Sequence, residues 1–101
     1  MYEVEAHADK TRDVRGYRVL GKVQGVGFRW WTRREALRLG IVGSVRNLAD
    51  GSVWVVGAGT ADDLERFEGS LRHGPPLAVV ERVERVEAAV DMGCTEFTVE
   101  G

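Results

Sequence analysis

The sequence predicts an α+β fold, a ferredoxin-like split β-α-β sandwich in which two helices cover one face of an antiparallel sheet. Strand-like and helix-like segments follow one another in the order β-α-β-β-α-β, and a short fifth strand-like segment comes last. The 101 residues, 44% of them hydrophobic, suffice for one domain with one core. Right-handed crossovers and short connections then give the strand order 4-1-3-2.

The first half of the domain is predicted to contain a strand, a glycine loop and a helix. Residues 17–23 carry apolar side chains at alternating positions, which predicts a strand. Residues 24–27 form the loop. Residues 28–39 have the spacing of an amphipathic helix that ends at Gly40, and its buried face is predicted to hold Phe28, Thr32 and Ala36.

A predicted hairpin follows this helix. Residues 41–48 and 52–57 are rich in valine and isoleucine, which favours two strands. The turn between them contains Asp50 and Gly51, residue types that accept the positive φ of tight hairpin turns.

The second half ends with a helix and two strands. Thr60 is predicted to cap the helix, and the sequence HGPP at residues 73–76 ends it. Residues 78–88 form the predicted fourth strand, with a bulge or a loosely packed end because its valines break strict alternation. Residues 96–100 form the short fifth strand, and the buried stripe of the helix is predicted to be Leu64, Phe67 and Leu71.

Composition and charge argue against several classes of protein. The net charge is −2, from 14 Lys+Arg and 16 Asp+Glu, whereas general nucleic-acid-binding proteins usually carry a basic excess. Basic character is local, with four arginines and one glutamate in residues 29–38. No apolar run approaches a membrane span, and residues 1–15, a predicted polar N-terminal extension before the domain of residues 16–101, lack a secretory-signal pattern. We therefore expect a soluble, cytoplasmic, monomeric protein without a membrane partner.

Metal-binding residue types are sparse. His7 and His73 lie far apart in the sequence and are interpreted as solvated side chains. Cys94 is the only cysteine, so an internal disulfide and a cysteine-only metal site are excluded. We expect no metal and no cofactor.

The stretch VQGVGFRWW, residues 23–31, contains an unusual helix start. The first amides of a helix lack intrahelical partners and carry partial positive charge, and a cation there is repelled by about 0.3–1 kcal/mol when exposed. Arg29 nevertheless occupies this turn, and Gly25 and Gly27 let the preceding loop point its N–H groups inward as an anion site. A phosphate would satisfy the amides and relieve the repulsion. The alternative is that the glycines only make a turn and Arg29 points to water.

Asn47 is a second unusual residue, because asparagine is depleted in strands and this one ends residues 41–48. It either bonds the local backbone at the turn, as asparagine often does, or faces the same anion as Arg29. The predicted topology favours the second interpretation. The first and second strands run in the same direction with the third between them, so their ends lie at one sheet edge, roughly 9–10 Å apart.

These groups suit phosphoryl transfer. Arg29 and the loop amides would bind a phosphoryl group and stabilise its developing charge. Asn47 has both a donor and an acceptor, so it can orient a water molecule. No strong general base accompanies them, and the substrate therefore needs a good leaving group. A mixed carboxylic–phosphoric anhydride fits this requirement, whereas an ordinary phosphate ester does not.

Two longer motifs resemble the signatures of the acylphosphatase family. GKVQGVGFR, residues 21–29, resembles the first signature, which Thr32 and Ala36 continue. GSVRNLADGSV, residues 43–53, resembles the second, and the HGPP sequence before a Val/Glu-rich strand is also similar. The resemblance covers about residues 17–100.

The resemblance implies hydrolysis of acyl phosphates to a carboxylate and inorganic phosphate, without a metal and without a phosphoenzyme. Arg29 would be the catalytic arginine that binds phosphate, and Asn47 would orient the attacking water. The implied partners are a small-molecule acyl phosphate and phosphate, with no nucleic acid. The substrate-binding amides would belong to Val23, Gln24, Gly25, Val26, Gly27 and Phe28.

Two other classes of function stay open at this point. Ferredoxin-like domains can bind RNA through aromatic residues on their central strands, but the third strand offers only Trp54 and the first only Tyr17. A noncatalytic sensor of small anions would use the same loop and the same arginine. Turnover of an acyl phosphate distinguishes the enzyme from the sensor.

Overall fold

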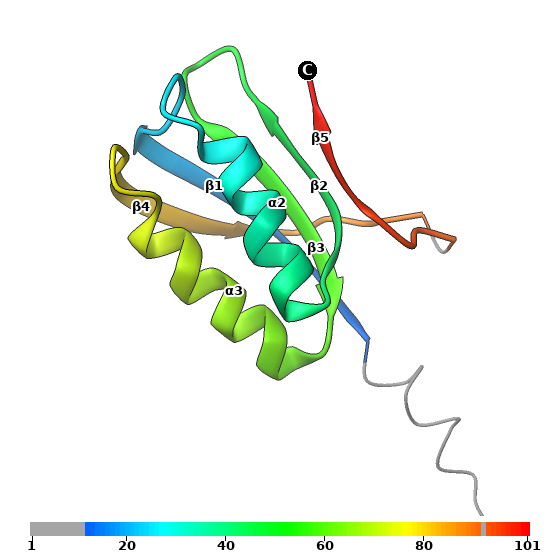
Figure 1. Cartoon of the computed structure of the whole chain (residues 1–101). Helices are drawn as coiled ribbons and strands as arrows, with labels where there is room; N and C mark the ends of the chain where they lie inside the picture. The colour runs from blue at the N-terminus through cyan, green and yellow to red at the C-terminus, as the bar shows by residue number, and fades with distance from the viewer. Residues whose placement is uncertain (1–11, 92) are drawn as a thin grey trace, which may run out of the picture.

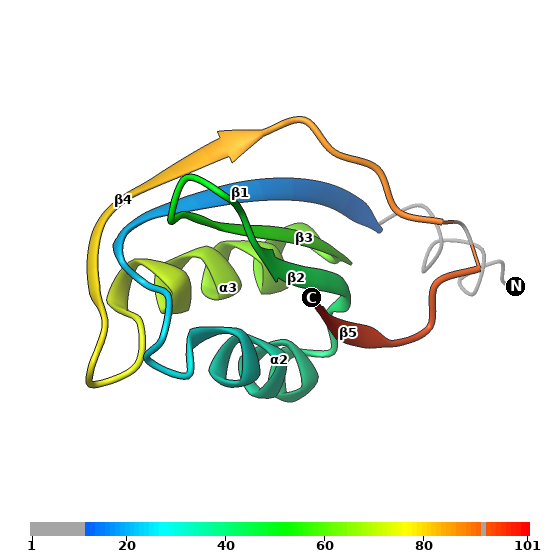
Figure 2. The same ribbon diagram turned by 90° about the horizontal axis from the view of Figure 1, so that it is seen from above.

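A computed structural model describes residues 12–91 and 93–101. Its elements are β1 (Asp13–Lys22), α2 (Phe28–Leu39), β2 (Val42–Asn47), β3 (Val53–Gly59), α3 (Ala61–His73), β4 (Val79–Val86) and β5 (Phe97–Glu100). They form one five-stranded sheet in the order β4-β1-β3-β2-β5, with both helices on the same face (Figure 1, Figure 2). The predicted architecture and the predicted order of the first four strands are confirmed.

β1 begins at Asp13, four residues before the predicted start of the strand. Asp13 to Gly16 pair with Gly59 to Val56 of β3, so backbone pairing extends the strand through a stretch whose side chains show no apolar alternation. Part of the predicted polar extension therefore belongs to the sheet. Residues 1–11 of that extension lie outside the described residues.

The predicted irregularity of the fourth strand is a β-bulge. Leu20 pairs with Arg82 and Gly21 pairs with Val80, so Glu81 is an extra residue in β4. Gly21 has a φ of 129°, and a Cβ atom at this position would lie 2.1 Å from the carbonyl oxygen of Val79. Glycine is therefore required where the bulge brings the two backbones together.

β5 corrects one feature of the predicted sheet. It pairs parallel with β2, with Gly43 opposite Phe97 and Arg46 opposite Glu100, so the sheet is mixed rather than wholly antiparallel. The chain after β4 passes along the outer face of the sheet, where Ala88 approaches Gly16. β5 therefore starts at the same end of the sheet as β2 and runs in the same direction (Figure 2).

The core lies between the helices and the sheet. Tyr17 is fully buried in it, with its ring edge against Phe67, and its hydroxyl donates to the carbonyl of Leu64 at 3.3 Å. The other aromatic residue of the central strands, Trp54, lies on the opposite face against Gly16. Tyr17 is therefore not available to stack on a nucleic-acid base. In residues 12–91 and 93–101, neither helix is long and apolar enough to span a membrane.

Candidate phosphate-binding site

The loop between β1 and α2 curls through two glycines. Gly25 and Gly27 have φ angles of 75° and 78°, in the left-handed region that glycine adopts without strain. A Cβ atom at either position would have nothing within 4 Å, so backbone conformation rather than space requires glycine. The predicted loop of residues 24–27 is present between β1 and α2, and its two glycines let it curl.

Apolar residues hold both ends of this loop in place. Val23 is 1% exposed directly after β1, and Phe28 is 2% exposed as the first residue of α2. Val26, in the middle of the loop, is half-buried and packs against the core. The backbone conformation of the loop is therefore fixed by the core beneath it.

The N-terminus of α2 lacks the groups that usually satisfy it. Its N-cap residue is Gly27, which has no side chain to accept a hydrogen bond, and its first turn contains no acidic residue. Among the described residues, the amide N–H groups of Gly25 to Trp30 find no protein acceptor. Arg29 adds a full positive charge to these free donors.

α3 shows how differently a helix of this chain can begin. Its N-cap residue Thr60 accepts a hydrogen bond from the amide of Asp63 at 3.1 Å, and Asp62 and Asp63 lie in its first turn. Acidic side chains there stabilise the partial positive charge of the helix end. α2 has the opposite charge pattern, so its first turn is suited to an external anion.

Arg29 extends from α2 toward the edge of the sheet. Its Nη1 atom donates to the carbonyl of Glu100 in β5 at 2.7 Å. One turn later, Nε of Arg33 donates to the carbonyl of Phe97 in the same strand at 3.1 Å. The guanidinium of Arg29 has five N–H donors, so this contact fixes its position and leaves other donors for a ligand.

Asn47 is the last residue of β2 and is exposed. It shares its side of the strand with the buried residues Gly43 and Val45, so its side chain leaves the sheet on the helix-covered face. Its neighbour Arg46 pairs with Glu100, the residue that Arg29 contacts. One edge of the sheet, the one formed by the ends of the strands, therefore carries all three segments. They are the N-terminus of α2, the end of β2 and the end of β5 (Figure 1).

Gln24 has a role that the sequence did not reveal. Its Nε2 atom donates to the carbonyl of Leu48 at 2.8 Å and to the carbonyl of Ser52 at 2.9 Å. These two carbonyls flank the turn that directly follows Asn47. The side chain of Gln24 thus ties the glycine loop to the strand end that carries Asn47.

We expect Gln24→Ala to lower both stability and activity. The substitution removes two side-chain hydrogen bonds, while each carbonyl keeps a backbone donor, from Gly51 to Leu48 and from Leu48 to Ser52. The loss costs about 0.5–1.5 kcal/mol per hydrogen bond, and it frees the loop to move relative to Asn47. A shift of about 1 Å can reduce kcat/KM roughly a hundredfold. Denaturant unfolding and steady-state kinetics measure the two effects. Gln24→Glu is the matched control, because it keeps the length but has no N–H donor, and it should behave like Gln24→Ala rather than like the wild type.

The turn next to Asn47 contains a carboxylate that cannot act as a base. Asp50 accepts hydrogen bonds from the amide and the hydroxyl of Ser52, at 2.9 Å and 2.5 Å, and pairs with Arg18. The hydrogen bonds from Ser52 make the largest contribution to the pKa of Asp50, and the hydrogen bond from Arg18 adds to it. Together they hold this pKa well below its usual range. Asp50 therefore stays ionised and stabilises the turn.

Metal-ligand clusters are also absent from the part of the chain that the structure describes. No group of three His, Cys, Asp or Glu side chains there lies close enough together to hold a metal ion. Cys94 is a free, half-buried thiol whose Sγ atom lies 3.3 Å from the carbonyl oxygen of Glu96.

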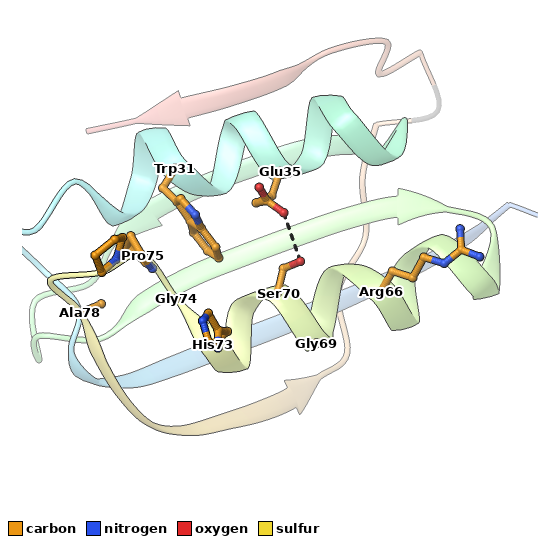
Figure 3. Close-up of a pocket in the computed structure, with 10 residues that line it drawn as sticks. Trp31, Glu35, Arg66, Gly69, Ser70, His73, Gly74, Pro75 and Ala78 are labelled. Carbon is orange, nitrogen blue, oxygen red and sulfur yellow. Dashed lines mark hydrogen bonds between the residues drawn. The ribbon is translucent and has the colours of Figure 1, made fainter.

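A larger groove than any around Arg29 and Asn47 lies between the two helices. A groove of about 960 Å³ separates α2 from α3 and is lined by Trp31, Ser70 and His73, among others, but by neither Arg29 nor Asn47 (Figure 3). Glu35 and Ser70 join across it by a hydrogen bond of 3.2 Å. Volume alone does not identify a reactive site, and the unpaired donors and the cation described above lie at the sheet edge instead.

We expect Gly69→Leu, which fills this groove, to leave activity unchanged and to stabilise the protein. Gly69 lies within α3, and a Cβ atom there would have nothing within 4 Å. Replacing a helical glycine by leucine contributes up to about 1 kcal/mol of stability. Thermal unfolding and hydrolysis of benzoyl phosphate measure both effects. A large loss of kcat/KM in a fully folded variant would instead place the reaction in the groove.

Comparison with known proteins shows the family of this chain. Residues 15–99 match the family model described as "Acylphosphatase". The chain is 41% identical over 97 residues to an acylphosphatase of Koribacter versatilis, covering 96% of this chain and 88% of that protein. It is 48% identical over 84 residues to an acylphosphatase of Rhizobium etli, covering 83% of this chain and 89% of the relative.

Solved structures with the same fold include two acylphosphatases. The structure from Coxiella burnetii has a TM-score of 0.85 and 35% identity, covering 92% of this chain and 97% of the other. The structure from Bacillus subtilis has a TM-score of 0.81 and 30% identity, covering 87% and 98%. The match extends over nearly all of the sheet and both helices. The chain therefore belongs to the acylphosphatase family of enzymes.

Proposed function

We propose that the chain hydrolyses acyl phosphates to a carboxylate and inorganic phosphate. Family membership supports this class of reaction, since the relatives named above are acylphosphatases. The observation that carries the proposal is the uncapped start of α2, where free amides and Arg29 lie at the same sheet edge as Asn47. An anion with several oxygens fits this set of donors.

In this proposal the phosphoryl group occupies the glycine loop. The amides of residues 23–28 and the guanidinium of Arg29 donate to its non-bridging oxygens. They stabilise the charge that increases on these oxygens as the bond to the leaving group lengthens. The contact between Arg29 and the Glu100 carbonyl holds the guanidinium in place before the substrate arrives, which reduces the reorganisation needed during the reaction.

Asn47 orients the water that attacks phosphorus. Its amide oxygen accepts a hydrogen bond from the water, and its amide nitrogen can donate to the water or to a phosphoryl oxygen. The new P–O bond forms to this water, the P–O bond to the acyl oxygen breaks, and the electron pair leaves with the carboxylate. One proton of the water passes to a phosphoryl oxygen, so the products are the carboxylate and inorganic phosphate. Since a carboxylate is a good leaving group, the step does not require a strong base.

The reaction proposed here needs neither a metal nor a cofactor, and its partners are the acyl phosphate and the phosphate product. Positive charge comes from Arg29 and the amide dipoles, which suffices for an activated anhydride. The test is release of phosphate from benzoyl phosphate and acetyl phosphate in the presence of EDTA. Rapid turnover supports the enzyme, whereas phosphate binding without turnover would identify an anion sensor. Equal turnover of simple phosphomonoesters would contradict the requirement for a good leaving group.

We expect inorganic phosphate to raise the melting temperature and to inhibit competitively. A ligand that binds only the folded state stabilises it by RT ln(1 + [L]/Kd), about 2.7 kcal/mol at a hundred times Kd. Scanning calorimetry with increasing phosphate, against chloride at the same ionic strength, measures the shift. An identical melting temperature in both salts would argue against an anion site at the loop.

A further inference from the structure

The turn between α3 and β4 exposes a large apolar side chain. The amide of Ala78 donates to the carbonyl of Pro75 at 3.0 Å, which closes a four-residue turn with Pro76 and Leu77 at its centre. Because proline fixes its own φ angle, the two prolines make this turn stiff. Leu77 is 73% exposed, more than any other large hydrophobic residue in the described part of the chain. A single exposed leucine is common in proteins, so its position decides whether it has a role.

This turn lies alongside the glycine loop. Gly74 comes directly before the turn, and a Cβ atom at Gly74 would lie 3.5 Å from the ring of Phe28. Val79 comes directly after the turn and pairs with Lys22. Since Lys22 ends β1 and Phe28 begins α2, the turn is held at both ends of the glycine loop. The two loops lie side by side at one end of the molecule (Figure 2).

The glycine loop has the turn on one side and Asn47 on the other. In the strand order β4-β1-β3-β2-β5, the end of β1 lies between the start of β4 and the end of β2. On the β2 side, Gln24 bonds the carbonyls of Leu48 and Ser52. A phosphoryl group on the loop would therefore have Asn47 toward β2 and Leu77 toward β4.

Phosphoryl transfer relates these two sides to the two ends of the reaction. The attacking and leaving oxygens lie roughly in line through phosphorus. In the proposed function, Asn47 holds the attacking water on the β2 side, so the acyl oxygen leaves on the β4 side. The acyl group bonded to that oxygen is then directed over the turn that carries Leu77.

Other exposed apolar residues near the loop are placed less well for this contact. The buried face of α2 comprises Phe28, Thr32 and Ala36. Trp30 is 63% exposed and lies about 160° around the helix from the centre of that face, so it points away from the sheet. Val79 is exposed, but Val80 packs against the core, so Val79 lies on the outer face of the sheet. Leu77 precedes the strand, at the level of the loop.

We propose that Leu77 contacts the acyl group of the substrate and gives this chain a preference for acyl phosphates with an apolar acyl group. This inference rests on the proposed function, from which it takes the positions of the phosphoryl group and the water. An aromatic acyl group would remove the Leu77 side chain from water, whereas an acetyl group offers only one methyl group for the contact. An acyl group with a second carboxylate would lose part of its hydration there. The contact exists before and during the reaction, so it should act on KM rather than on kcat.

Steady-state kinetics with benzoyl phosphate and acetyl phosphate test the proposal. The wild type should have the lower KM for benzoyl phosphate. Leu77→Ala should raise this KM about three- to tenfold, as expected for the loss of part of an apolar contact, and leave kcat nearly unchanged. The KM for acetyl phosphate should change much less. Leu77→Lys should lower the KM for succinyl phosphate, whose acyl group carries a carboxylate, and high salt should reduce this gain.

Leu37→Ala is the matched control. Leu37 is 53% exposed near the C-terminal end of α2, far along the helix from the glycine loop, and its replacement should leave both KM values unchanged. Circular dichroism and thermal unfolding show whether each variant is folded.

Three results would overturn the assignment of Leu77. The first is a wild-type KM that is the same for benzoyl and acetyl phosphate. The second is a folded Leu77→Ala in which the ratio of the two KM values is unchanged. The third is a selective rise in the KM for benzoyl phosphate in Trp30→Ala with none in Leu77→Ala, which would place the acyl group against α2. If the wild type hydrolysed neither substrate, the proposed function itself would be wrong, and this inference with it.

Discussion

Arg29→Ala is expected to lower kcat/KM for benzoyl phosphate by at least about 10²–10³-fold, the loss typical of removing one donor to a developing oxyanion. The substitution removes the only full positive charge in the first turn of α2. It should change stability little. Loss of the contact to Glu100 costs about 1 kcal/mol, and relief of repulsion at the helix end offsets part of it. Steady-state kinetics together with denaturant unfolding measure the two effects.

Arg33→Ala is the matched control for this prediction. Arg33 lies one turn later on the same helix and also donates to a carbonyl of β5. Its removal should reduce stability by about 1 kcal/mol and leave kcat/KM within a few-fold of the wild type. If Arg33→Ala lost as much activity as Arg29→Ala, the two arginines would act by holding β5, and the proposed contact of Arg29 with phosphate would be wrong.

Asn47→Ala should lower kcat about a hundredfold, because the attacking water loses the group that orients it. KM should change less than kcat, since phosphate binding rests on Arg29 and the loop amides. Stability should change little, because Asn47 is exposed and its side chain makes no hydrogen bond within residues 12–91 and 93–101. Kinetics under saturating substrate and thermal unfolding check these expectations.

Two further variants isolate the role of Asn47. Asn47→Asp keeps the shape but places a negative charge beside the phosphoryl group, so its activity should be at or below that of the alanine variant. Arg46→Ala alters the neighbouring residue, which lies on the opposite face of β2, and should leave kcat nearly unchanged. Normal turnover by a folded Asn47→Ala would instead assign Asn47 to the turn alone.

The local features of this chain were predictable because they depend on short-range rules. The glycine loop before α2 follows from residue type, as does the capping of α3 by Thr60. The bulge in β4 was expected from its broken alternation of valines, although its position at Glu81 was not. The start of β1 was placed too late, because a polar strand end carries no pattern that marks it.

Arg29 and Asn47 could be nominated from the sequence, since one is a cation at a helix start and the other an asparagine at a strand end. The contacts that hold them could not. Arg29 meets Glu100 across 71 positions in the sequence, and Gln24 meets Ser52 across 28. Such contacts depend on how the folded sheet brings distant segments together. The acceptors are backbone carbonyls, which every residue has, so the sequence does not show which residue will accept. Residue type and local position thus predicted the candidate residues from the sequence. Only the packing of the folded sheet determined which contacts hold their side chains in place.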